Sequence, residues 1–214
     1  MHALSGLLLV VFALVAALVH QRVLAPLDQA LMRVVKSSIG ADIDFIGGVL
    51  TYVAAAEVSV ALGIAGSLAL RVTGVRGWSA LAPLFFVATV PIEVAMKFTL
   101  DQPVPSGDLY RESIRYVLLG LPTMQSFPSG HSIRAMFIAV VGTYLAWRWE
   151  GRRGAITAGA LLSLVVVTSG WTRVYLGHHW PIDVIGGWIF GAAIGVFSVA
   201  TLCKARDRAG QNAP

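Results

Sequence analysis

Charged residues and cysteine are scarce in this chain of 214 residues. Asp, Glu, Lys and Arg make up 13% of it and hydrophobic residues 57%, whereas a soluble domain carries about 25% charged residues. Apolar content on this scale exceeds what one soluble core requires. We therefore expect an integral membrane protein with a single all-α domain over residues 1–214. The only cysteine, Cys203, excludes an intrachain disulfide.

A concentrated basic surface is also lacking. The formal net charge is +5, but the Lys and Arg residues lie between apolar runs and form no basic face, which excludes nucleic acid as a partner. The last stretch, from about residue 204 to residue 214, is predicted to be a polar tail.

Six apolar stretches approach the roughly 20 residues that a helix needs to cross a bilayer. They are Leu4–Val19, Tyr52–Leu70, Trp78–Leu100, Ser132–Trp147, Ala155–Ser169 and Val184–Cys203. The first could also be a signal peptide, but it begins without Lys or Arg, and no clear small-residue cleavage site follows it. The stretch Gln21–Asp44 mixes apolar and charged residues, which predicts a helix lying in the membrane interface after the first span.

Six crossings would assign every loop to one side of the membrane. Three short connections are rich in Arg or Lys, namely Arg71–Gly77, Arg148–Gly154 and Lys204–Arg208. By the positive-inside rule, these three connections are cytoplasmic. The protein is expected to lie in the cell (inner) membrane. The loops after the first, third and fifth spans then share the extracytoplasmic face.

Three polar segments lie at span ends on that face: Lys97–Pro105, Phe127–Ser132 and Thr172–Asp183. In the third segment, His179 and Asp183 stand four residues apart, and they would share a face if this segment is helical. A carboxylate there can accept the imidazole Nδ1–H, which leaves Nε2 as a nucleophile toward phosphorus. The alternative is a structural His–Asp pair at a helix surface or at the membrane interface.

In the second segment, Ser129, Gly130 and His131 precede an apolar run, and Pro128 blocks backward extension of that helix. Ser129 is predicted to be the N-cap, and the helix start offers N–H groups and a positive dipole end suited to an anion. Gly130 would let the anion approach, and His131 could protonate a leaving oxygen. A plain serine cap followed by a boundary histidine is the alternative.

Positive charge for a phosphate could come from Arg173, whose fork of donors matches phosphate oxygens, and from Lys97. Lys97 could instead snorkel to the interface beside Glu93, four residues earlier. Glu57 and Glu93 lie within predicted spans, where ionisable groups are expensive, but the sequence assigns neither a role. No metal or other cofactor is expected, because these cations would repel an ion and the adjacent histidines at 178 and 179 diverge by about 100° on a helix.

Together, the three segments resemble the type 2 phosphatidic acid phosphatase superfamily, whose motifs are Lys-x6-Arg-Pro, Pro-Ser-Gly-His and Ser-Arg-x5-His-x3-Asp. The matching residues are, in motif order, Lys97 and Pro105, then Pro128–His131, then Arg173, His179 and Asp183. Thr172 replaces the serine of the third motif. The family's architecture of six spans, with the motifs in this order, would cover nearly the whole chain.

The resemblance implies a role for each matching residue. His179 would be the nucleophile, Asp183 would orient it, and His131 would be the general acid for the leaving group. The phosphate oxygens would be held by Lys97, Ser129, Gly130 and Arg173. The family's chemistry requires no metal.

One part of the family pattern is missing. The arginine of the first motif falls on Val104, and a second arginine often seen two positions earlier falls on Gln102. Arg111, Arg115 and Arg134 are close enough in sequence to substitute. We choose Arg134 as a phosphate-binding residue, because it follows His131 by three residues and would share its face.

The resemblance implies a hydrolase that dephosphorylates a membrane lipid through a phosphohistidine on the extracytoplasmic face. The expected substrate is undecaprenyl diphosphate, phosphatidylglycerol phosphate or phosphatidate. The enzymatic alternatives are a lipid phosphotransferase and a lipid A phosphatase. A non-catalytic transporter or scaffold of the same fold is a further alternative, but it would not need His131, His179 and Asp183 together.

Overall fold

The computed structural model describes residues 1–37, 54–106, 109 and 125–211. In these residues, all regular elements are helices, apart from one isolated bridge between Pro103 and Gln125. The helices are α1 (His2–His20), α2 (Ala25–Ser37), α4 (Ala56–Val72), η2 (Gly77–Ala88), α5 (Thr89–Thr99), α6 (Gly130–Tyr175) and α7 (Pro181–Gln211). The prediction of an all-α chain is confirmed for this part.

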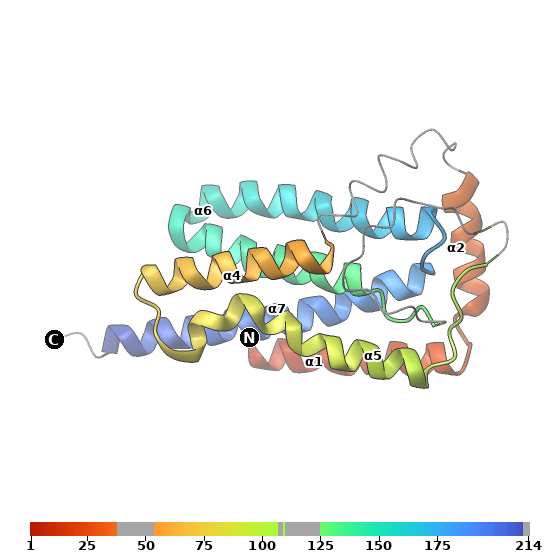
Figure 1. Ribbon diagram of the computed structural model, residues 1–214, viewed down its shortest axis with the longest axis horizontal. Coiled ribbons are helices and arrows are strands. Elements are labelled where there is room, and N and C mark those ends of the chain that lie inside the picture. Colours follow the sequence, from red (N-terminus) through yellow and green to blue (C-terminus); the bar gives the residue numbers. More distant parts are fainter. Residues whose placement is uncertain (38–53, 107–108, 110–124, 212–214) are drawn as a thin grey trace.

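The long helices lie side by side in a bundle, and α2 lies across one end of it (Figure 1). Helix α6 runs out and back, because its direction reverses at Gly151, where φ is 71° and ψ is −154°. A positive φ is accessible to glycine without the Cβ clash that other residues meet. The expected spans Ser132–Trp147 and Ala155–Ser169 are therefore the two arms of α6.

Four helical stretches of the described chain are long and apolar enough to cross a membrane: His2–His20, Gly77–Thr99, Gly130–Tyr175 and Pro181–Asp207. Their outer faces carry large apolar side chains. Leu7 and Leu14 of α1 are 59% and 60% exposed, and Leu161 and Leu164 of α6 are each 61% exposed. Apolar surface on this scale is unfavourable in water and is accommodated by lipid.

Two predicted elements differ in detail. The predicted span Trp78–Leu100 divides into the 3-10 helix η2 and the α-helix α5, and Pro83 within η2 removes a backbone donor that an α-helix would use. The predicted interfacial helix is represented by α2, with residues 38–44 outside the described chain. Helix α2 buries Asp28 and Met32 and exposes apolar side chains on its other face, including Val34.

Glycines allow α7 to pack tightly against the first arm of α6. Gly187, Gly191 and Gly195 recur every four residues along α7. A Cβ on Gly187 would lie 2.6 Å from the Ser129 carbonyl oxygen, and one on Gly191 would clash with the carbonyl of Ile133. Small residues at this spacing let two helix backbones approach closely. The start of α6 is thereby held against the second and third turns of α7.

An aromatic cluster attaches α1 and the segment before α6 to α7. The ring of Phe12 stacks on that of Phe190 at a centroid distance of 4.5 Å and on that of Phe127 at 5.9 Å. Ser5 Oγ also donates to the Ala193 carbonyl oxygen at 2.9 Å. These contacts hold α1 and the segment before α6 against α7.

Candidate active site

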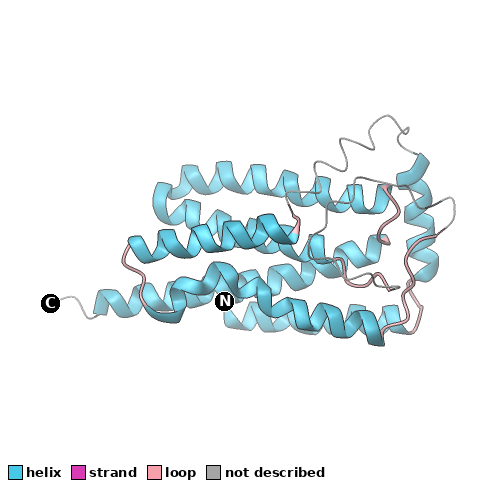
Figure 2. Ribbon diagram, in the orientation of Figure 1, coloured by secondary structure: helices cyan, strands magenta, loops and turns pink. Residues whose placement is uncertain are grey.

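The three polar segments meet at the end of the bundle that α2 covers (Figures 1 and 2). Lys97 lies in the last turn of α5, His131 in the first turn of α6 and Arg173 in its last turn. His179 lies in the short connection between α6 and α7. Because α6 runs out and back, both of its ends contribute to one site.

The His179–Asp183 pair is built on the start of α7. Pro181 is the first residue of α7, where its missing N–H costs nothing. Asp183 Oδ2 accepts a hydrogen bond from the Trp180 backbone N–H at 2.8 Å, which is one half of a capping box. His179 therefore lies before the helix rather than on it, so the condition for a shared helix face is not met. Its Nδ1 nevertheless lies 3.4 Å from Asp183 Oδ2.

Electrostatics keep His179 neutral. Burial is the main cause that lowers the pKa of His179 well below the usual 6.5, and the charges of Arg173 and Lys97 lower it further. The backbone N–H of His179 donates to the Arg173 carbonyl oxygen at 3.2 Å. A neutral imidazole whose Nδ1–H faces a carboxylate presents an Nε2 lone pair. The 3.4 Å separation is long for a hydrogen bond, and such bonds commonly shorten when substrate binds.

His131 is surrounded by guanidinium groups. Its Nδ1 lies 3.0 Å from Arg173 Nη2 and 3.5 Å from Arg134 Nη2, and Arg173 Nη1 lies 3.0 Å from Nδ1 of His178. Because a guanidinium can only donate, Nδ1 of His131 must accept. The ring therefore carries its proton on Nε2 in this structure.

Ser129 is at the N-cap of α6, as predicted, but no hydrogen bond of its side chain caps the helix. Ser129 N–H donates to the Asp183 carbonyl oxygen at 3.0 Å, and Ser129 Oγ accepts from Ser132 Oγ at 3.0 Å. Ser129 is fully buried, so in this structure it joins α6 to α7. Gly130 is the first helical residue, where backbone N–H groups have no intrahelical partner.

Lys97 and Arg134 share one anionic neighbour. Lys97 Nζ lies 2.9 Å from Glu93 Oε1, and Arg134 Nη1 lies 3.8 Å from Glu93 Oε2. Arg134 Nε also donates to the Ala54 carbonyl oxygen at 3.1 Å. The expected sharing of a face by Arg134 and His131 is seen. Arg111 and Arg115, the other candidate replacements, lie outside the described residues.

A buried carboxylate that was not predicted from the sequence lies against the start of α7. Asp28 of α2 is 2% exposed. Its Oδ1 accepts the Ile182 backbone N–H at 2.8 Å, and its Oδ2 accepts Gln102 Nε2 at 3.1 Å. Burial is the main cause that raises the pKa of Asp28 to about 7, although the bond from Ile182 lowers it. Gln102, where the family often has arginine, thus lies in the support of the α7 start.

Two carbonyl groups of the first polar segment complete that support. Trp180 Nε1 donates to the Pro103 carbonyl oxygen at 2.8 Å, and Ser126 N–H donates to that of Gln102 at 2.8 Å. The only sequence signal for Asp28 was an acidic residue inside an amphipathic stretch, which is too common to single it out. Among the described residues, no group of three His, Cys, Asp or Glu side chains is close enough to hold a metal ion.

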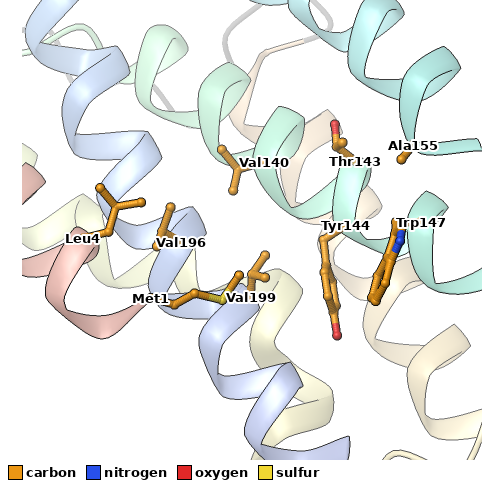
Figure 3. Close-up of a pocket in the computed structure, with 9 residues that line it drawn as sticks. All are labelled: Met1, Leu4, Val140, Thr143, Tyr144, Trp147, Ala155, Val196 and Val199. Carbon is orange, nitrogen blue, oxygen red and sulfur yellow. The ribbon is translucent and has the colours of Figure 1, made fainter. Parts of the chain in front are cut away.

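An apolar pocket lies away from these residues. A pocket of about 350 Å³ is lined by apolar side chains of α1, both arms of α6 and α7, including Leu4, Val140, Trp147 and Val196 (Figure 3). Val140 and Trp147 lie ten and seventeen residues after Gly130, or roughly 15–25 Å along the helix. The pocket is therefore separate from the polar site.

Comparison with known proteins agrees with this architecture. Residues 77–207, more than half of the chain, match the PAP2 superfamily. The chain belongs to the PAP2 superfamily.

Two curated relatives carry the same activity in their names. An Escherichia coli protein, YbjG, provisionally named an undecaprenyl-diphosphatase, is 30% identical over 132 residues, which cover 60% of this chain and 62% of that protein. An undecaprenyl-diphosphatase of Sulfolobus acidocaldarius is 38% identical over 114 residues, which cover 53% of this chain and 50% of the relative. The chain thus spans about half to three fifths of the length of these relatives.

Two crystal structures share the fold. A transmembrane PAP2-type phosphatidylglycerolphosphate phosphatase from Bacillus subtilis superposes with a TM-score of 0.76 at 21% identity, covering 94% of this chain and 96% of that one. Aquifex aeolicus LpxE superposes with a TM-score of 0.59 at 24% identity, covering 81% and 95%. The first superposition extends the common fold over nearly the whole chain.

Proposed function

We propose that this chain is a lipid phosphatase that removes phosphate from a membrane lipid phosphate or diphosphate. The observation that carries the proposal is the His179–Asp183 pair in one site with His131 and Arg173. The names of the two curated relatives make undecaprenyl diphosphate the first substrate to test. The phosphatidylglycerol phosphate and phosphatidate classes follow it.

The proposed reaction has two steps. Nε2 of His179 attacks the phosphorus atom, and the bond from phosphorus to the leaving oxygen breaks as His131 gives that oxygen a proton. Water then attacks the phosphohistidine and loses a proton to His131, which releases phosphate and restores His179. Asp183 stabilises the positive charge that develops on His179. Lys97, Arg134, Arg173 and the first N–H groups of α6 stabilise the phosphate oxygens.

Proton donation requires a change at His131. In this structure, its Nδ1 accepts from Arg173, and a neutral imidazole is a very weak acid. A bound phosphate offers Arg173 a better acceptor, and its negative charge favours the imidazolium form of His131. Substrate binding would therefore both release His131 from Arg173 and charge it for catalysis.

The proposed membrane arrangement has six crossings: α1, α4, η2 with α5, the two arms of α6, and α7. The site then faces the extracytoplasmic side, because the Arg-rich reversal of α6 lies at the opposite end of the bundle. Single cysteines at Ser106 and at Gly151, in a Cys203→Ser background, test this in intact cells. An impermeant thiol reagent should label position 106 and not position 151. Labelling of position 151 and not of position 106 would show that the protein has the opposite orientation in the membrane.

The chemistry is tested by measuring phosphate release from a panel of lipid phosphates by purified protein in detergent. We expect turnover in EDTA, inhibition by vanadate and complete loss of activity in His179→Ala, while His20→Ala, a matched change at an exposed histidine in the last turn of α1, retains turnover. Near-normal activity of His179→Ala would refute the phosphohistidine mechanism. Loss of activity in EDTA that zinc or magnesium restores would show a metal-dependent reaction. Transfer of phosphate to an added alcohol in place of water would identify a phosphotransferase.

A further inference from the structure

The carboxylate of Glu93 lies among the groups that should hold the substrate phosphate. Its Oε1 lies 2.9 Å from Lys97 Nζ and its Oε2 lies 3.8 Å from Arg134 Nη1. The three side chains are only 12–15% exposed. Both carboxylate oxygens also lie over Gly130, so close that a Cβ on this glycine would clash with them. An acidic group thus occupies the space above the start of α6.

A simple helix pair does not account for this position. Glu93 and Lys97 are four residues apart on α5, so their mutual contact is ordinary for a helix. The contacts with Gly130 and Arg134, however, reach across to α6, and they are made at a helix start whose N–H groups favour an anion. Two cations and a helix N-terminus surround the carboxylate in this partly buried place, which offsets the cost of burying its charge.

We propose that Glu93 is a resident anion of the phosphate site and determines how tightly this site holds phosphate. In this structure its carboxylate lies against Lys97, Arg134 and the start of α6 and offsets their positive charge. An incoming phosphate must displace it, because two anions cannot share these donors at close range. Glu93 therefore weakens binding of free phosphate and favours substrates that gain further binding energy from a lipid portion. This inference rests on the proposed lipid phosphatase function.

Replacement of Glu93 by glutamine tests the proposal, because it removes the charge and preserves the shape of the side chain. Orthophosphate binding to full-length protein in detergent is measured by calorimetry, and its inhibition constant is measured against lipid phosphate turnover. We expect Glu93→Gln to bind orthophosphate at least about tenfold more tightly, since a close repulsion between two anions is removed. KM for a short-chain lipid phosphate should fall, and kcat should not rise, because product leaves more slowly.

Glu150→Gln is the matched control. Glu150 lies at the reversal of α6, about 30 Å along the helix from Gly130, and the change should leave phosphate affinity and turnover as in the wild type. Glu93→Asp retains the charge on a shorter side chain and provides a second folded variant. It should bind phosphate less tightly than Glu93→Gln.

Two outcomes would overturn the role of Glu93. An unchanged affinity in Glu93→Gln would make the residue a bystander, and a weaker affinity would make it a support for Lys97. The proposed phosphatase function fails by a separate result, the absence of phosphate release by the wild type from every lipid. Calorimetry would still compare orthophosphate binding by the wild type and Glu93→Gln in that case, so the two failures are distinguishable.

Discussion

The side chains of α6 and α7 differ sharply in chemistry between the end of the bundle that holds the candidate site and the opposite end. At the site end, His131 Nδ1 of α6 lies 3.5 Å from Arg134 Nη2, and Asp183 Oδ2 of α7 accepts the Trp180 backbone N–H. Toward the other end, the same arm of α6 presents Val140, Tyr144 and Trp147 to an apolar pocket (Figure 3). The cations there, such as Arg152, lie exposed at the reversal.

This contrast reflects where a helical membrane protein has backbone groups to offer. Mid-helix N–H and C=O groups bond to one another, so side chains there serve mainly to pack. Helix ends leave backbone groups without intrahelical partners, and these groups can bind an anion or a capping carboxylate. At the end of the bundle that holds the site, the start of α6, the end of α6 and the start of α7 adjoin one another.

Four predictions test this contrast, and they are given in order of decreasing effect.

Loss of the His131 imidazole should have the largest effect of the four. His131→Ala should lower turnover of a lipid phosphate by about 10²–10⁴-fold, the usual contribution of a general acid. The loss should be much milder with an activated aryl phosphate, whose leaving group needs little protonation. Thr143→Val, in the apolar pocket of the same arm, should leave both rates unchanged. Equal losses of His131→Ala with the two substrates would contradict an acid role.

Loss of the Arg134 guanidinium should have the next largest effect. A charge-assisted contact is worth about 1.5–3 kcal/mol, so Arg134→Ala should lower kcat/KM by about tenfold to over a hundredfold. Arg152→Ala, at the far end of the same arm, is the control and should behave as the wild type. If Arg134→Ala also keeps wild-type kinetics, the site uses fewer donors, and Val104→Arg should raise the affinity for simple phosphates.

Two glycine substitutions compare packing at the two ends. Gly191→Ala pushes a methyl group into the Ile133 carbonyl and should lower the free energy of unfolding by about 1–3 kcal/mol, as overpacking does. Gly6→Ala meets open space in α1 and should be neutral or stabilising, because alanine favours a helix. Thermal unfolding in detergent measures both. A Gly191→Ala protein as stable as the wild type would show that close contact of α6 and α7 is dispensable.

The smallest effect concerns the pH dependence of stability. Burial raises the pKa of Asp28 in the folded protein to about 7, whereas the usual pKa of this side chain is 3.8. The unfolded chain therefore binds fewer protons than the folded one in this window, and stability from Asp28 is lost as pH rises from about 4 through about 7. On a change from pH 5 to pH 8, the wild type should lose more thermal stability than Asp28→Asn. Parallel losses would show that Asp28 titrates normally.

Much of the fold could be predicted from the order of apolar stretches. The two arms of α6 and helix α7 occupy the predicted stretches, because long apolar runs have few alternatives to a helix in lipid. Local conformation was less accessible. The division of the third stretch into η2 and α5 depends on Pro83 and on its packing against the α4 glycines Gly63 and Gly66. Six crossings and the interfacial position of α2 remain predictions.

The candidate site shows the same division. The types of residue available to the site could be read from the motifs. The parity of the predicted spans also indicated that the catalytic and phosphate-binding side chains can lie on one side of the membrane, namely His131, Arg173, His179 and Asp183. Both inferences are possible because motif spacing and the number of spans depend only on the order of residues along the chain. Only the tertiary structure decided that Asp28 supports the α7 start, that Ser129 is occupied by a bond to α7 and that Glu93 covers Gly130. The physical reason is that each of these contacts joins different helices, and their geometry depends on how closely the helices pack.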